Sequence, residues 1–202
     1  MKLDNQILEW KLCMGYFSVL EISMSSDISI DKLCIEAKIS KEEAETIIPK
    51  NPMDHRIFFL KILISKLDKD TLTELKVDIA DDTISSTYDK ILEGLSLRFE
   101  KYFQYKQSLK ILSNNSKQII EIFLNVFKEN YNFSFNLLTL IEEDQNCAIK
   151  SLKSLALNIV FTKSLEIFFK DEKKDIDKVI RYLDKYLSDM EDIGLFMGLI
   201  KK

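Results

Sequence analysis

The residue types that most often carry out catalysis are scarce in this chain of 202 residues. His55 is the only histidine, so a Ser-His-Asp or Cys-His device would have to use it, and a multi-histidine metal site is excluded. We expect His55 to lie on a helix surface beside Asp54. The sequence has neither a Gly-rich phosphate loop nor the two Glu-x-x-His units of a helical di-iron centre. It therefore predicts a protein that is not an enzyme and binds no metal or cofactor.

Cysteine usage and charge limit the compartment and the partners. Cys13, Cys34 and Cys147 are far apart and form no C-x-x-C, which indicates free thiols in a reducing compartment rather than a zinc site. Charges interrupt the first apolar run, so we expect no signal peptide, and no later segment resembles a transmembrane span. The net charge of −4 gives no support to a general nucleic-acid binder. The sequence predicts a cytoplasmic protein.

One apolar stretch, residues 146–169, is expected to organise the chain. Its apolar residues recur at the i, i+3, i+4 spacing of a helix face, and between Leu155 and Phe161 only Asn158 is polar. A helix that is apolar nearly all round needs neighbours on several sides, so we expect the central helix of a bundle. Only 4 glycines and 2 prolines punctuate the chain. The predicted fold class is all-α.

The first fifty residues are typical of a helix-turn-helix unit: a long helix, a short helix, a tight turn and a second short helix. Ser29 is placed to cap the first short helix, and Ser40 with Glu43 forms a capping box at the start of the second. Pro49 and Pro52 end that helix. We therefore expect two domains, residues 1–52 and residues 53–202, with a further break in the polar segment 81–87.

The order of helices resembles the TetR superfamily. Ile30-Asp31-Lys32-Leu33, Ala37 and Ile39-Ser40-Lys41 are similar to that family's second helix, turn and Ser-Lys opening of the recognition helix, and Pro49 stands where the recognition helix commonly ends. The resemblance implies an N-terminal DNA-binding domain and a larger helical domain that binds a small apolar effector and forms a homodimer. In such a regulator the DNA contacts would come from Ser40, Lys41, Thr46 and Lys50.

The expected recognition helix departs from that family in its charge. Glu42, Glu43 and Glu45 stand where family members usually present Gly, Thr, Tyr and His. At ~8 Å in water each carboxylate is repelled by a phosphate by roughly 0.5 kcal/mol, and the repulsion grows as water leaves the interface. Residues 1–50 carry six lysines against nine acidic residues, a net charge of −3. Ordinary operator binding is therefore disfavoured.

A second resemblance covers about half of the chain. Residues 95–112, 156–190 and 47–56 are similar to the lipid-binding accessory protein of ubiquinone biosynthesis, and Arg98 corresponds to an arginine of that family. The family has a TetR-type fold without DNA binding, and it presents a lipid or quinone intermediate to the demethoxyubiquinone hydroxylase. Lys150-Ser151 replaces the aromatic Trp-Tyr pair that the family uses to dock that hydroxylase.

This resemblance implies a lipid site among the helices 89–103, 116–131 and 146–169. The same residues are also what any dry helical core requires, and that alternative stays open. The tail 193–202 is suited to peripheral contact with the inner membrane, or to packing on the bundle or in a dimer interface. The candidate lipid-binding residues are Phe99, Phe103, Phe123, Phe127, Leu157, Phe161 and Phe168. The candidate membrane-contact residues are Leu195, Phe196, Met197, Leu199 and Ile200.

Overall fold

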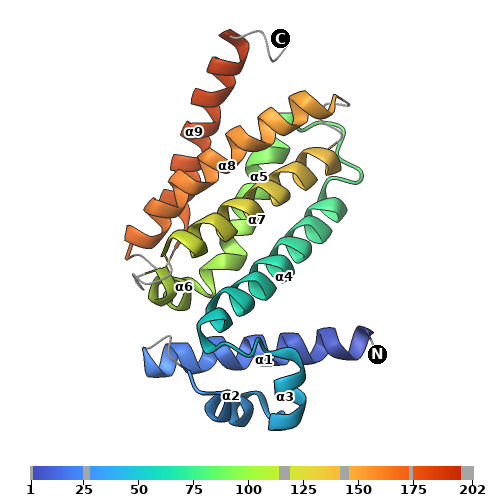
Figure 1. The fold of residues 1–202 in the computed structure, drawn as a ribbon. Coiled ribbons are helices and arrows are strands. Elements are labelled where there is room, and N and C mark those ends of the chain that lie inside the picture. The colour runs from blue at the N-terminus through green and yellow to red at the C-terminus, as the bar shows by residue number, and fades with distance from the viewer. Residues whose placement is uncertain (1, 25–27, 114–118, 142–145, 173–174, 197–202) are drawn as a thin grey trace. The chain divides into compact units, whose positions relative to one another are not determined.

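The structure is a computed structural model that describes residues 2–24, 28–113, 119–141, 146–172 and 175–196. Every regular element in these ranges is a helix, and none is a strand, which confirms the all-α fold class (Figure 1). The helices are α1 (Lys2–Ser23), α2 (Ile30–Ala37), α3 (Lys41–Ile47), the 3-10 turn η1 (Pro52–Asp54), α4 (His55–Asp78), α5 (Thr87–Phe103), α6 (Lys106–Ser113), α7 (Ile119–Leu140), α8 (Cys147–Lys170) and α9 (Asp177–Phe196).

The short helices begin and end at the residues that the sequence predicts. The Ser29 hydroxyl accepts the Lys32 amide at the start of α2. At the start of α3, Ser40 and Glu43 form both hydrogen bonds of the capping box. The chain leaves α3 at Ile48 in an extended conformation, as the residue before a proline prefers. Both helix starts are therefore encoded locally, by side chains that bind free backbone amides.

The longer helices α4 and α7 continue through polar residues that do not break them. Helix α4 is continuous from His55 to Asp78, and α7 continues from Ile119 to Leu140 through the polar residues near its middle. Asn146 caps α8 by accepting the amides of Ala148 and Ile149. Burial of one apolar face stabilises such helices more than local propensity does.

The chain divides into two compact units. Unit 1 comprises Met1–Lys66 with Tyr105–Val126, and unit 2 comprises Leu67–Gln104 with Phe127–Lys202. This division differs from the expected boundary at residue 52, because the first half of α4 and the whole of α6 belong to the same unit as α1, α2 and α3. Two of the three boundaries fall inside α4 and α7, and the third falls in the turn between α5 and α6.

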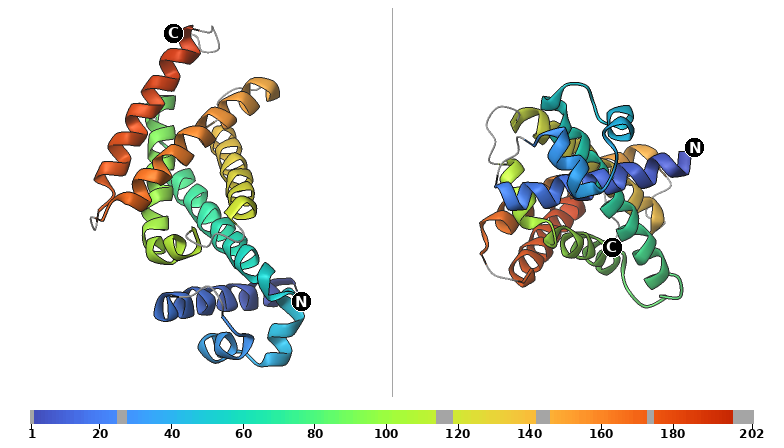
Figure 2. Two further views of the ribbon diagram at one scale, coloured as in Figure 1. Left: turned by 60° about the vertical axis from the view of Figure 1, so that its left-hand side comes forward. Right: turned by 90° about the horizontal axis from the view of Figure 1, so that it is seen from below.

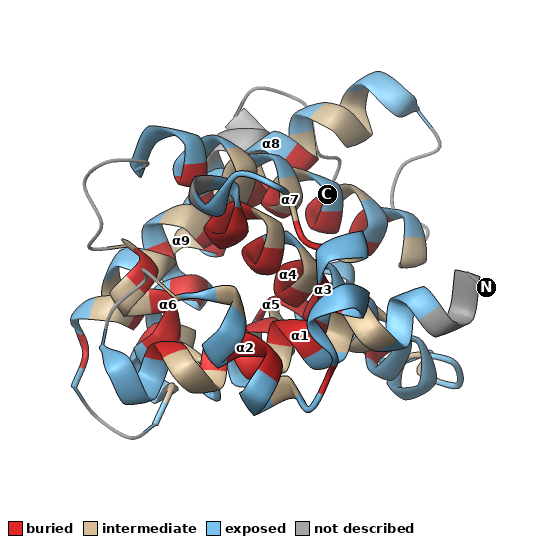
Figure 3. Ribbon diagram, turned by 60° about the horizontal axis from the view of Figure 1, so that its bottom comes forward, coloured by how far each residue is buried: buried red, intermediate tan, exposed pale blue. Residues whose placement is uncertain are grey.

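Unit 1 is organised by α1, which packs against α2, α3 and α6 (Figure 3). The ring of Tyr16 stacks on Phe59 of α4, with 4.6 Å between ring centroids. A Cβ placed on Gly15 would lie 3.0–3.2 Å from the backbone and Cβ of Ala37, so glycine allows the close crossing of α1 and α2. The expected helix-turn-helix segment thus rests on a tightly packed first helix.

Of the helices that the sequence assigned to ligand binding, unit 2 contains α5, α8 and the part of α7 from Phe127 onward. Helix α9 packs against both α8 and α5 (Figures 1 and 2). The Tyr88 hydroxyl at the start of α5 donates to the Asp184 carboxylate of α9 over 2.7 Å. Gly94 of α5 lies against Leu75 and Leu137, where an added Cβ would come within 2.9 Å of each side chain. Helices α4, α5 and α7 therefore meet at this glycine.

One face of α8 remains exposed although it is apolar. Leu152, Leu155 and Ile159 lie at helical spacing and are 46, 39 and 37% exposed. The opposite face, which carries Val160 and Phe161, is buried. The expectation that α8 is surrounded on several sides therefore holds for only part of its circumference among the described residues. None of the helices that the structure describes is long and apolar enough to cross a membrane.

Candidate functional site

Four of the seven predicted lipid-binding residues form one aromatic cluster in unit 2. Phe99 of α5 stacks on Phe161 of α8 with 4.4 Å between ring centroids, and its ring lies 5.4 Å from that of Phe168. Phe103, one turn after Phe99, meets the edge of Phe168 at 6.5 Å. The i, i+4 and i, i+7 spacings of these residues put them on single helix faces, which is why the sequence pattern found them.

The remaining three predicted residues have different surroundings. Leu157 is buried one turn before Phe161 on α8. Phe127 is half-buried, and its backbone carbonyl accepts the Asn158 amide at 2.9 Å. Phe123 is 51% exposed and belongs to unit 1, so the structure does not bring it to the cluster.

A buried ion pair adjoins the aromatic cluster. The Arg98 guanidinium donates from Nε to Asp68 Oδ1 over 2.6 Å and from Nη2 to Asp68 Oδ2 over 2.7 Å. The Tyr102 hydroxyl donates to the same carboxylate over 3.2 Å. Arg98 has no exposed surface, and its Cζ lies 4.2 Å from the Phe133 ring centroid and 4.3 Å from that of Phe161. Three helices besides α5 thus enclose one positive charge.

The environment fixes the protonation of this group of residues. Burial acts most strongly on the Arg98 guanidinium and would lower its pKa, but Asp68 and Tyr102 together outweigh burial and hold that pKa above its usual value. Burial raises the pKa of the Tyr102 hydroxyl well above its ordinary value, so Tyr102 stays protonated and acts as a donor to Asp68. Burial also raises the pKa of the Asp68 carboxyl, although Arg98 and Tyr102 act to lower it. The two short hydrogen bonds from the guanidinium are those of an ion pair, in which the two charges compensate each other.

Two side chains here have hydrogen-bonding groups without a partner. Arg98 Nη1 donates to no acceptor, and neither the Nδ2 nor the Oδ1 atom of Asn130 is paired, although both residues have no exposed surface. A buried polar group left unpaired costs about 1–3 kcal/mol, so most such groups in proteins have partners. A dry apolar core has no use for these atoms. These atoms could be satisfied by buried water or by a bound molecule.

The sequence pattern did not find Asp68, Asn130 or the pairing of Arg98. The signal that could have found them is a polar residue at a position of the apolar helix face. Arg98 lies three residues after Leu95 and next to Phe99, and Asn130 lies three before Phe133, all on buried faces. Pairing of Asp68 with Arg98, 30 residues apart, has no local signal.

The residues of the alternative DNA-binding reading lie on or beside α3 in unit 1. Ser40 is occupied as the cap of the helix, and Thr46 Oγ1 donates to the Glu43 carbonyl. Lys41 Nζ forms an ion pair with Asp31 over 2.9 Å, and this pair raises the Lys41 pKa. Lys50 is exposed. Thus one of the two lysines of this segment is already paired with a carboxylate.

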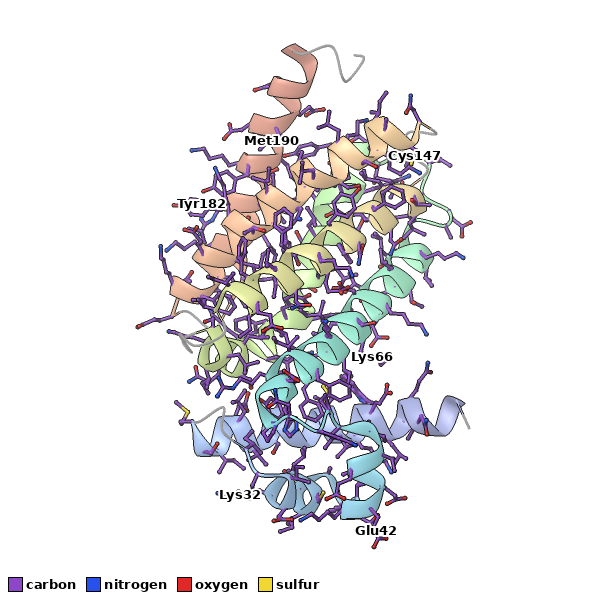
Figure 4. All side chains as sticks on the ribbon, viewed as in Figure 1. Lys32, Glu42, Lys66, Cys147, Tyr182 and Met190 are labelled. Carbon is purple, nitrogen blue, oxygen red and sulfur yellow. The ribbon has the colours of Figure 1, made fainter. Side chains whose placement is uncertain are left out.

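The outer surface of α3 is acidic. Glu42, Glu43 and Glu45 are all exposed, and Figure 4 shows the Glu42 side chain pointing away from the neighbouring helices of unit 1. Hydrogen bonds from Ser40 lower the pKa of Glu43, so this carboxylate stays charged. The three glutamates that distinguish this helix from the family pattern are therefore all on its surface.

No family model, curated protein or solved structure matches the chain.

His55 corrects one expectation from the sequence. It lies at the first position of α4, where we expected a surface residue, but it is only 3% exposed. Its Nε2 pairs with the Pro49 carbonyl at 2.9 Å. The ring also meets that of Phe59 on α4, with 6.4 Å between ring centroids, so the turn before α4 and the helix itself both contact it. Among the described residues, no group of His, Cys, Asp and Glu side chains could hold a metal ion.

The candidate membrane-contact residues fall at the C-terminal end of α9 and beyond it. The side chains of Leu195 and Phe196 and the whole of Met197, Leu199 and Ile200 lie outside the described residues.

Proposed function

We propose that this chain is a non-enzymatic binding protein for an apolar, lipid-like ligand, which it holds inside unit 2. The observation that carries the proposal is the aromatic cluster around Arg98, in which a buried guanidinium N–H and a buried amide have no partner. Small-molecule sites are typically lined by apolar and aromatic side chains with a few polar groups that orient the ligand. A plain core would explain the rings but not the unpaired atoms.

The second resemblance supplies a biological setting for this proposal. In that setting the ligand is an isoprenoid or quinone precursor, and the protein presents it to a hydroxylase of the ubiquinone pathway. The chain would work in the cytoplasm or at the inner membrane, with residues 193–202 as its peripheral membrane contact. The exposed apolar face of α8, at Leu152, Leu155 and Ile159, supports the further proposal that the protein is a homodimer.

A TetR-type transcriptional regulator with a small apolar effector is the second candidate. The capped helices α2 and α3, packed on α1, favour it because they have the order of a helix-turn-helix unit. The acidic exposed side chains of α3 weigh against it, because phosphate neutralisation by Lys and Arg drives most DNA affinity.

Extraction of the purified protein tests the first candidate. We expect mass spectrometry of an organic extract to find apolar lipid in molar proportion to the protein, well above an unrelated helical protein purified in parallel. An extract with no lipid above that background would contradict the proposal.

Gel-shift experiments with promoter DNA test the second candidate. We expect no tight duplex binding at low salt. A salt-dependent shift at nanomolar protein would instead establish the regulator, because the release of counterions makes DNA binding fall steeply with salt.

A further inference from the structure

The Arg98 guanidinium contacts α7 in unit 2 one turn away from Asn130. The Phe133 ring lies 4.2 Å from Arg98 Cζ, and Asn130 is three residues before Phe133 on the same buried face of α7. The turn before Asn130 is anchored by the Asn158 amide on the Phe127 carbonyl. Asn130 thus lies on α7 between Phe127, whose carbonyl binds the Asn158 amide, and Phe133, whose ring contacts Arg98.

Helix packing agrees with this placement. Gly94 of α5 lies against Leu137 of α7, and one turn further along α5 the Arg98 guanidinium lies against Phe133. These two contacts show that α5 and α7 run antiparallel here. The next turn of α7, which carries Asn130, therefore lies opposite the turn of α5 that carries Tyr102. Asn130 thus lies about one turn of α7 beyond the point where Arg98 contacts that helix.

We propose that Arg98 and Asn130 bind the oxygen head group of an uncharged amphiphile. The inference rests on the proposed function and adds the chemical class of the ligand. Arg98 Nη1 and Asn130 Nδ2 are free donors, and Asn130 Oδ1 is a free acceptor, so together they match a hydroxyl or a carbonyl group. The rings of Phe133 and Phe161 face the same guanidinium and would pack against the apolar part of the ligand.

Charge decides between an uncharged head group and an anionic one. Asp68 already neutralises Arg98 with two hydrogen bonds, so a carboxylate ligand would add an uncompensated negative charge to a buried site. A cationic ligand would add an uncompensated positive charge in the same way. An uncharged alcohol or carbonyl compound adds no net charge and still satisfies the free donors.

Three probes with the same alkyl chain separate these cases: hexadecane, hexadecanol and palmitate. We expect delipidated full-length protein to bind hexadecanol at least tenfold more tightly than either of the others in equilibrium dialysis. Asn130→Leu keeps the size of the side chain and removes both amide atoms. It should weaken hexadecanol about tenfold, or ~1.4 kcal/mol, and leave hexadecane unchanged. Asn136→Leu, an exposed asparagine of the same helix, is the matched control and should change neither affinity.

The outcomes distinguish the head-group site from the proposed function. Equal binding of all three probes, unaffected by Asn130→Leu, would overturn the site while leaving an apolar binding protein. Tightest binding of palmitate would overturn the uncharged class. If none of the probes binds and Asn130→Leu only stabilises the fold, the free atoms are satisfied by water, and both the site and the proposed function fail.

Discussion

Removal of the Asp68 charge should strongly destabilise unit 2. In Asp68→Asn the guanidinium of Arg98 keeps its charge but loses the carboxylate that binds it through two hydrogen bonds of 2.6 and 2.7 Å. Breaking a buried pair by neutralising one partner costs about 3–5 kcal/mol, because the other charge stays buried and uncompensated. The aromatic rings around Arg98 offset part of this by cation–π attraction, each by roughly 0.5–2 kcal/mol. We therefore expect a loss near the lower limit, about 3 kcal/mol.

Urea unfolding followed by circular dichroism measures this loss. With a denaturant dependence of about 2 kcal/mol per molar urea, the midpoint should fall by ~1.5 M. Glu74→Gln is the matched control, because it breaks the Lys101–Glu74 pair between the same two helices at an exposed position. Such a pair contributes about 0–1 kcal/mol.

A double replacement tests whether the burial of charge is the cause. Asp68→Leu combined with Arg98→Met removes both charges and leaves apolar side chains of similar size, so it should cost much less than Asp68→Asn alone. An unchanged midpoint in Asp68→Asn, or a double variant as unstable as the single one, would refute the reasoning.

Three further predictions concern contacts elsewhere in the two units. Gly15→Ala should cost about 1–3 kcal/mol of stability, because the new Cβ would meet backbone atoms of α2 at 3.1 Å, and a gain in urea midpoint would contradict that contact. Tyr88→Phe should lose about 1 kcal/mol with its bond to Asp184, whereas Tyr182→Phe on the exposed side of α9 should lose none. Backbone amides lower the Asp82 pKa to about 2, so the carboxylate stabilises the fold above the unfolded-state pKa near 4, and this contribution is lost as the pH falls through about 2. Asp82→Asn should remove that part of the acid sensitivity, seen in urea midpoints compared between neutral pH and about pH 3, and an equal pH slope in the variant would argue against it.

Local signals account for what the sequence predicts well. The cap at Ser29 and the capping box of Ser40 with Glu43 involve residues three apart, so the chain needs no tertiary partner to form them. The faces of α5 and α8 that carry Phe99 and Phe161 follow from helical periodicity in the same way. Fold class and part of the aromatic cluster could therefore be predicted.

Tertiary contacts account for what the sequence misses. His55 is contacted by the carbonyl of Pro49, which lies in the turn before α4. Phe123 has the spacing of a core residue but lies on an exposed turn of α7, since periodicity marks an apolar face without saying what covers it. The partner of Arg98 is a residue on another helix, and no spacing rule relates the two.

The buried polar residues of unit 2 have two different explanations. An ion pair such as that of Arg98 and Asp68 seldom stabilises a fold more than apolar residues of the same volume would, and its usual benefit is to fix one packing arrangement. Such a pair performs that role best when every atom is bonded, which Nη1 of Arg98 is not. Asn130 cannot perform it at all, because neither atom of its amide is bonded to a neighbour. Under the proposed function these atoms would bind a ligand, and otherwise buried water would satisfy them. Asn130 is therefore the decisive residue to replace, because its replacement leaves the Arg98–Asp68 pair intact.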